Sequence, residues 1–112
     1  MQKSKTQNFN KHYVEKFQKA QRLQQTGHLV EAERTYQEIL QDIPDNPDCI
    51  HFLGLLFFQK GELDKAEINY KKSIELAQNP TYLNNYALLA CHRKDYKNAI
   101  ELLLESIKLK SD

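Results

Sequence analysis

Histidine and cysteine are the side chains of this sequence best suited to metal binding or to nucleophilic catalysis, and their spacing indicates whether either is expected. The chain holds four histidines and two cysteines: His12, His28, His51, His92, Cys49 and Cys91. None of the histidines has a second histidine, a cysteine or a pair of carboxylates at the spacing of a metal site. We therefore expect no metal ion and no other cofactor.

A catalytic thiol is the other chemistry to consider, because His92 directly follows Cys91. Adjacent residues on a helix point about 100° apart, whereas a thiol nucleophile needs an imidazole within hydrogen-bond reach and a third group that orients it. The sequence also contains neither a glycine-rich phosphate loop nor a GxSxG nucleophile motif. It predicts a protein that is not an enzyme.

Composition favours one small helical domain. The 112 residues are 40% hydrophobic and 28% charged, with three glycines and three prolines, too few for the turns of an all-β protein. The net charge of +1 gives no reason to expect a nucleic-acid partner, and no apolar stretch predicts membrane insertion or export. Both cysteines are then expected to be free thiols in a reducing compartment, the cytoplasm.

Three stretches of the chain match one another at nearly constant spacing. A shift of 34 residues and a further shift of 33 superimpose these pairs: Gly27 with Gly61, Ala32 with Ala66, Tyr36 with Tyr70, Ala66 with Ala99, Ser73 with Ser106, and Ile74 with Ile107. The second shift is shorter because the loop before Pro80 is one residue shorter than the loop before Pro47. A register that recovers after a deletion in a loop indicates a structural repeat.

Each repeat is predicted to hold two helices. Asn46-Pro47 and Asn79-Pro80 are typical of helix starts, while Gly27 and Gly61 can take the left-handed conformation that ends a helix. Lys94-Asp95 fills the third break without glycine, so we expect a strained turn there or a cap from the aspartate. The expected helices span residues 13–25, 29–42, 47–59, 63–76, 80–92 and 96–109.

The second repeat carries the most specific pattern: Leu53, Gly54, Phe57, Gly61, Leu63, Ala66, Tyr70 and Ser73. This pattern resembles the tetratricopeptide repeat. The resemblance implies an all-α fold, a right-handed superhelical solenoid of three antiparallel helix pairs. The domain would cover residues 13–112, in repeats of about 13–46, 47–79 and 80–112, with residues 1–12 as a polar N-terminal tail or helix extension. Lys94 in place of glycine and Lys19 in place of an apolar residue depart from the pattern.

The resemblance further implies a scaffold that binds proteins, because the first helix of each such repeat lines a concave groove. The groove positions carry mixed apolar, amide and imidazole side chains, which suit a peptide or helix of a partner protein. They are Phe17, Gln21, Gln24, His51, Leu55, Phe58, Gln59, Asn84, Asn85, Leu88 and His92. We expect His51 and His92 to be solvated there, and Phe52 and Phe57 to belong to the core. The cations of a carboxylate clamp are missing, so an acidic C-terminal tail is not the expected ligand.

The last expected helix is apolar well beyond one stripe, and its docking face would comprise Ile100, Leu104 and Ile107. An uncovered face of this kind predicts self-association, a docking partner or further repeats. The stretch from Pro47 to Leu55 resembles the opening repeats of bacterial proteins that join such arrays to glycosyltransferase or methyltransferase domains. The alternative to a peptide-binding scaffold is therefore an oligomerisation or docking module, or a fragment of a longer enzyme such as a glycosyltransferase.

Overall fold

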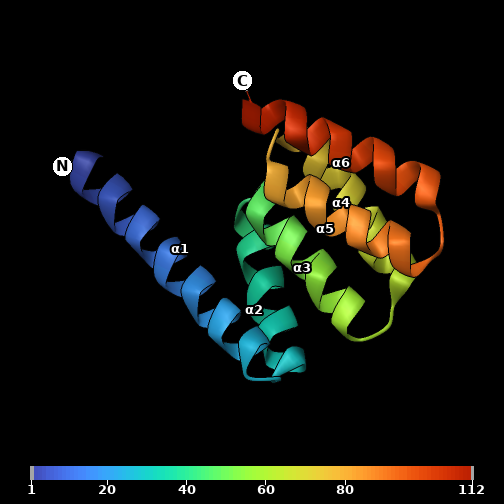
Figure 1. Cartoon of the computed structure of the whole chain (residues 1–112). Helices are drawn as coiled ribbons and strands as arrows, with labels where there is room; N and C mark the ends of the chain where they lie inside the picture. The colour runs from blue at the N-terminus through green and yellow to red at the C-terminus, as the bar shows by residue number, and fades with distance from the viewer. Residues whose placement is uncertain (1, 112) are drawn as a thin grey trace.

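A computed structural model describes the backbone of residues 2–111 and the side chains of residues 11–111. The described chain folds into six α-helices (Figure 1): α1 Gln2–Gln25, α2 Leu29–Asp42, α3 Pro47–Gln59, α4 Leu63–Leu76, α5 Pro80–His92 and α6 Tyr96–Ser111. The middle four match the predicted helices at both ends. The first prediction began too late, because α1 starts at Gln2, and the polar segment before residue 13 continues that helix. Met1 lies outside the described residues.

The helices pack as consecutive pairs, α1 on α2, α3 on α4 and α5 on α6, and each pair contacts the next through α2 with α3 and α4 with α5. The all-α repeat fold expected from the sequence is confirmed. In Figure 1, α1 begins well away from the other helices and joins them in its second half. Within the described residues, no helix combines the length and the hydropathy needed to cross a membrane.

Local capping fixes the helix boundaries. The side chains of Asn46 and Asn79 accept hydrogen bonds from the backbone N–H groups of Cys49, at 3.2 Å, and of Thr81, at 2.9 Å. These bonds satisfy amides that have no partner inside the helix. Gly27 and Gly61 end the first helix of their repeats with φ of 85° and 80°, a conformation that costs glycine nothing. The sequence therefore set four of the boundaries through these residues.

Small residues let the two helices of each pair approach closely. Ala20 and Ala32 face each other's helix in the first pair, and both are fully buried. In the second pair, Gly54 and Ala66 lie at the equivalent positions and are also buried. A Cβ atom added to Gly54 would lie 2.9 Å from Cδ1 of Tyr70, which is closer than van der Waals contact allows. The glycine is thus required by packing rather than by backbone conformation.

The third break confirms the expected strain. Lys94 adopts φ of 64°, and Oδ1 of Asp95 accepts a hydrogen bond from the backbone N–H of Asn98 at 3.3 Å. An L-residue in this region costs about 1–2 kcal/mol. Lys94→Gly is expected to raise the free energy of unfolding by about 0.5–1 kcal/mol, since the relief exceeds the greater entropy of glycine in the unfolded chain. Urea denaturation measures the change.

The matched control is Lys72→Gly, which removes another exposed lysine, this time from inside α4. Glycine inside a helix lowers stability by about 1 kcal/mol relative to alanine, so the two substitutions should act in opposite directions. If both variants were destabilised, the strain assigned to Lys94 would be absent.

Candidate peptide-binding groove

The inner face of the array is formed by the first helices of the three repeats. Helix α1 contacts α3, and α3 contacts α5, whereas α2, α4 and α6 make no such contacts with one another in the described part of the chain. One layer of helices is therefore more closely spaced than the other. An array with this difference curves toward the closely spaced layer, which places α1, α3 and α5 on the concave side.

Side-chain contacts link these inner helices in a regular series. The rings of Phe17 and Phe52 meet edge to face at 5.4 Å between centroids, and those of Phe58 and His92 at 5.5 Å. Between them, the amides of Gln24 and Gln59 hydrogen-bond at 2.9 Å. In each pair the second residue lies one position beyond the repeat equivalent of the first. Because the offset is constant, the second repeat packs on the first in nearly the same orientation as the third packs on the second.

Two hollows lie between α1 and α3 on this concave side. The first, of about 290 Å³, is lined by Tyr13, Val14, Phe17, Gln18, Gln21, Asn46 and Asp48. The second, of about 90 Å³, is lined by Gln21, Gln24, Gln25, Phe52, Leu55 and Gln59. Gln21 borders both, so the two hollows adjoin, and they are called the groove below. It brings together five of the residues that the sequence placed on the concave face: Phe17, Gln21, Gln24, Leu55 and Gln59.

Gln24 is buried under this groove, with only 5% of its surface exposed. Its Oε1 accepts a hydrogen bond from the Tyr36 hydroxyl at 2.6 Å, and its Nε2 donates to the carbonyl of Phe52 at 3.2 Å and to Gln59. Burial raises the pKa of Tyr36, so the hydroxyl stays protonated and remains a donor. With its amide satisfied by protein groups, Gln24 positions α1 on α3 and leaves Gln21 and Gln59 nearer to solvent.

The prediction that His51 is a solvated groove residue is wrong. Its side chain is fully buried, and its ring stacks on Tyr82 at 4.5 Å between centroids. Its Nε2 lies 2.9 Å from Nδ2 of Asn85, while Nδ1 is buried without a hydrogen-bond partner. Burial lowers the pKa of His51 to about 4, although Asp48 opposes the shift. Besides Phe52 of α3 itself, the aromatic residues against it are Tyr70 of α4 and Tyr82 of α5, so spacing within α3 could not predict its burial.

The C-terminal part of the concave face is more open. Leu88 exposes 63% of its surface, His92 is also exposed, and Phe58, Asn84 and Asn85 are half-buried. These five residues extend the face beyond the two hollows toward the end of α5. The core prediction for its neighbours is confirmed for Phe57, which is buried, while Phe52 is partly buried and packs against the core.

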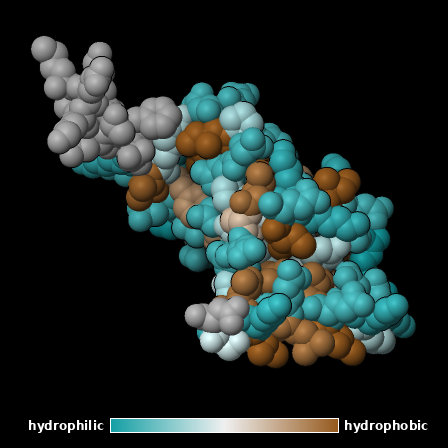
Figure 2. Space-filling view, turned by 90° about the horizontal axis from the view of Figure 1, so that it is seen from above, coloured by the Kyte–Doolittle hydropathy of each residue, from teal (hydrophilic) through white to brown (hydrophobic). Residues whose placement is uncertain are grey.

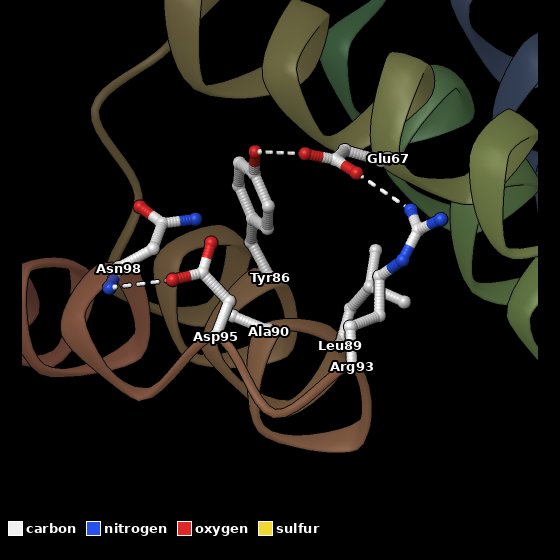
Figure 3. A pocket seen from close by; sticks show the side chains of 7 residues that line it. All are labelled: Glu67, Tyr86, Leu89, Ala90, Arg93, Asp95 and Asn98. Carbon is white, nitrogen blue, oxygen red and sulfur yellow. Dashed lines mark hydrogen bonds and ion pairs between the residues drawn. The ribbon is translucent and has the colours of Figure 1, made fainter.

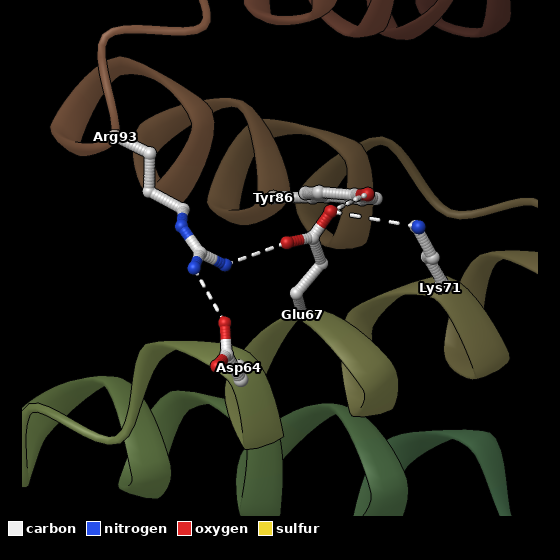
Figure 4. Close-up of polar contacts among 5 residues, drawn as sticks. All are labelled: Asp64, Glu67, Lys71, Tyr86 and Arg93. Carbon is white, nitrogen blue, oxygen red and sulfur yellow. Dashed lines mark hydrogen bonds and ion pairs between the residues drawn. The ribbon is translucent and has the colours of Figure 1, made fainter.

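A polar cluster on the other side of the array was not predicted from the sequence (Figure 4). Arg93 donates to Glu67 at 2.7 Å and also binds Asp64, and Glu67 accepts a hydrogen bond from the Tyr86 hydroxyl at 3.1 Å. Lys71 lies 3.5 Å from the same carboxylate. The cluster joins α4 to α5, so it holds the second and third repeats together.

A hollow of about 250 Å³ lies beside this cluster (Figure 3), lined by Glu67, Tyr86, Leu89, Ala90, Arg93, Asp95 and Asn98. Its polar groups are already paired, since Glu67 binds Tyr86 and Arg93, and Asp95 caps α6. Comparison of equivalent positions in successive repeats could have predicted the ion pair between Glu67 and Arg93. Lys60 and Glu33, one repeat earlier, form the equivalent ion pair at 3.6 Å. The described residues contain no group of three His, Cys, Asp or Glu side chains that could hold a metal ion.

Comparison with known families gives a match in the central repeat. Residues 47–80, which form α3, α4 and the loop to α5, match the family model for the tetratricopeptide repeat. The central pair of helices is therefore similar to one tetratricopeptide repeat. Comparison with curated proteins gives no match.

Solved structures share the tetratricopeptide-type fold at low sequence identity. MamA from Desulfovibrio magneticus RS-1 superimposes with a TM-score of 0.81 at 18% identity, over 89% of this chain and 57% of that one. The type III secretion translocator chaperone SycD of Yersinia enterocolitica, described as an alternative dimer, gives 0.81 at 16%, over 88% and 76%. A mutant O-GlcNAc transferase of Thermobaculum terrenum gives 0.81 at 24%, over 88% and 19%. The chain thus spans about half of MamA and a fifth of the transferase.

Proposed function

We propose that this protein is a non-catalytic scaffold that binds a peptide or a helix of a partner protein in its concave groove. The observation that carries the proposal is the pair of adjoining hollows between α1 and α3, whose lining combines the apolar side chains of Phe17 and Leu55 with the amides of Gln21 and Gln59. Apolar residues in such a groove anchor side chains, and amides hydrogen-bond to the peptide backbone. The tetratricopeptide repeat and the likeness to a chaperone support this reading.

The groove chemistry limits the ligand to an uncharged segment with apolar side chains. Among the described residues, Asp48 is the one charged residue that lines the two hollows, and no lysine or arginine borders either of them. An acidic tail would gain no ion pair there. The free thiols of Cys49 and Cys91 fit a reducing compartment, the cytoplasm, as the place of this binding.

Selection of peptides from a random display library on the immobilised protein tests the proposal. Peptides that bind should be apolar and uncharged, and Leu55→Arg should weaken them at least about tenfold, because a guanidinium would be buried in the groove without a partner. Fluorescence anisotropy of labelled peptides gives the dissociation constants.

Val30→Arg is the matched control, since Val30 is an exposed residue of the outer helix α2, 69% accessible. It should leave peptide binding unchanged. Leu88→Arg provides a second groove variant at an already exposed position and guards against misfolding of Leu55→Arg. Selected peptides that bind both groove variants as tightly as the native chain would place the binding site elsewhere.

A further inference from the structure

The last helix presents an apolar stripe to solvent. Tyr96, Ile100, Leu103, Leu104 and Ile107 follow one another at helical spacing, and each leaves between 40% and 61% of its surface exposed. The opposite side of α6 packs on α5 through Ala99, Leu102 and Ser106. Figure 2 looks down on α6 and shows hydrophobic surface gathered at one edge of the molecule there. A stripe of this length on one helix needs a covering surface.

Another repeat of the same kind explains only part of the stripe. Leu103 and Ile107 occupy the positions of Tyr70 and Ile74, which are buried or packed against the core, but Ile100 and Leu104 depart from the register. Ile100 occupies the register position of Glu33 and Glu67, whose carboxylates pair with the basic residue of the next repeat, Lys60 or Arg93. A further repeat placed on α6 would lack this ion pair. Leu104 occupies the position of Gln37 and Lys71, which stay exposed although the next repeat is present. The third repeat has thus become apolar at two positions where stacking keeps polar residues.

Stacking of the chain's own first helix on α6 is disfavoured as well. Helices α3 and α5 each contact the preceding repeat, and they bury the apolar residues Ile50, Leu53, Leu56, Leu83, Tyr86 and Leu89. At the equivalent positions α1 carries Lys16, Lys19 and Arg22. Burying three cations against an apolar stripe would cost far more than it gains. Head-to-tail assembly of copies is therefore prevented at the N-terminal end.

We infer that the stripe is covered by the same stripe of a second copy of this chain, with the two α6 helices antiparallel about a two-fold axis. The sequence of the stripe is symmetric about the midpoint between Leu103 and Leu104, since Ile100 and Ile107 lie at equal distances from it. An axis at this midpoint places Ile100 against Ile107 of the second copy and Leu103 against its Leu104. A two-fold contact requires such a self-complementary surface.

Charges beside the stripe select the antiparallel orientation. Glu101 and Lys108 both lie on the flank next to Leu104, seven residues apart on the helix. In the antiparallel pair Glu101 lies near Lys108 of the second copy, and the symmetric pair forms across the axis. A parallel pair would instead place this flank of the two helices on opposite sides of the interface, so neither ion pair could form. Flanking charges of this type set helix orientation in coiled coils.

The contact is small, so we expect a weak dimer. From Ile100 to Ile107 the stripe spans about 11 Å, and with Tyr96 about 17 Å, at 1.5 Å per residue. One helix pair of this length lies at or below the lower end of specific interfaces, about 1,200 Å² in total. We expect a dissociation constant on the order of 10 µM, which corresponds to roughly 7 kcal/mol.

Light scattering after size exclusion, from about 2 to 200 µM protein, tests the dimer. The native mass should rise from that of the 13.2 kDa monomer toward twice this value, and Leu104→Glu should hold it at the monomer value throughout. Val30→Glu, at an equally exposed apolar residue of α2, should dimerise as the native chain does. A native chain that is monomeric at the highest concentration, or a Leu104→Glu variant that still dimerises, would overturn the inference.

Cross-linking tests the orientation independently of affinity. In a Cys91→Ser background only the buried Cys49 remains, so one cysteine can be introduced on the stripe. A short bismaleimide should join Leu104→Cys chains, which lie next to the axis. It should not join Tyr96→Cys chains, which the antiparallel pair holds about 22 Å apart along the helix. Efficient cross-linking of Tyr96→Cys would show a parallel pair instead. Because peptide binding is measured in the groove, the two proposals can fail separately.

Discussion

Gly54→Val is expected to lower the free energy of unfolding by about 3 kcal/mol, the largest effect of any single substitution considered. The first added carbon would lie 2.9 Å from Cδ1 of Tyr70 and 3.1 Å from Cβ of Asn69. Tyr70 is 1% exposed and packs against His51 and Tyr86, so its ring has no space into which it could turn. Helices α3 and α4 must separate instead, which opens the centre of the core.

Two comparisons isolate this packing effect. Leu88→Val, at an exposed position of α5, measures the lower helix propensity of valine alone, which is a few tenths of a kcal/mol. Gly54→Ala should lie between the two, because the gain in propensity partly offsets the clash of its single methyl group. Urea titrations followed by circular dichroism give all three values. A Gly54→Val variant as stable as Leu88→Val would show that the helix crossing adapts to a side chain.

Acid should destabilise the protein by about 3 kcal/mol through His51 alone, the second large effect expected. The pKa of this imidazole is lowered from 6.5 to about 4 by burial. The unfolded chain therefore takes up a proton below pH 6.5, whereas the folded chain does not until the pH nears 4. The stabilisation that His51 contributes is fully present above pH 6.5. It is lost as the pH falls from 6.5 to about 4, and no further loss from His51 occurs below that.

The measurement is the free energy of unfolding in urea at intervals between pH 7.5 and 4.5. His51→Phe should flatten the slope in this window whatever its own effect on stability, because the titrating group is gone. His92→Phe, at an exposed histidine, should keep the native slope. An undiminished slope in His51→Phe would assign the acid sensitivity to other groups.

Most of the fold followed from local sequence features. Asn46-Pro47 and Asn79-Pro80 define helix starts, and Gly27 and Gly61 define helix ends, through interactions within a few residues. The 34-residue register then indicated which helices pair. The start of α1 was missed because the preceding segment is polar, without the apolar periodicity on which the prediction relied.

The candidate site was less predictable because it depends on contacts between repeats. His51 and Gln24 sit at inner positions that are solvated in a single repeat, but Tyr82 and Phe52 from the neighbouring helices cover them. The ion pair between Glu67 and Arg93 crosses a repeat boundary in the same way. Comparing Lys60 with Arg93 and Glu33 with Glu67 across repeats would have identified it.

The contact pattern has a consequence for how strain travels through this chain. Within the described residues, the first repeat touches the second and the second touches the third, while the first and third do not meet. Each repeat is thus coupled directly only to its neighbour, and the first and third repeats can fluctuate independently of each other. A ligand long enough to contact α1, α3 and α5 together would restrict the motion of all three repeats relative to one another. Its binding would then couple the two ends, which the protein alone leaves uncoupled.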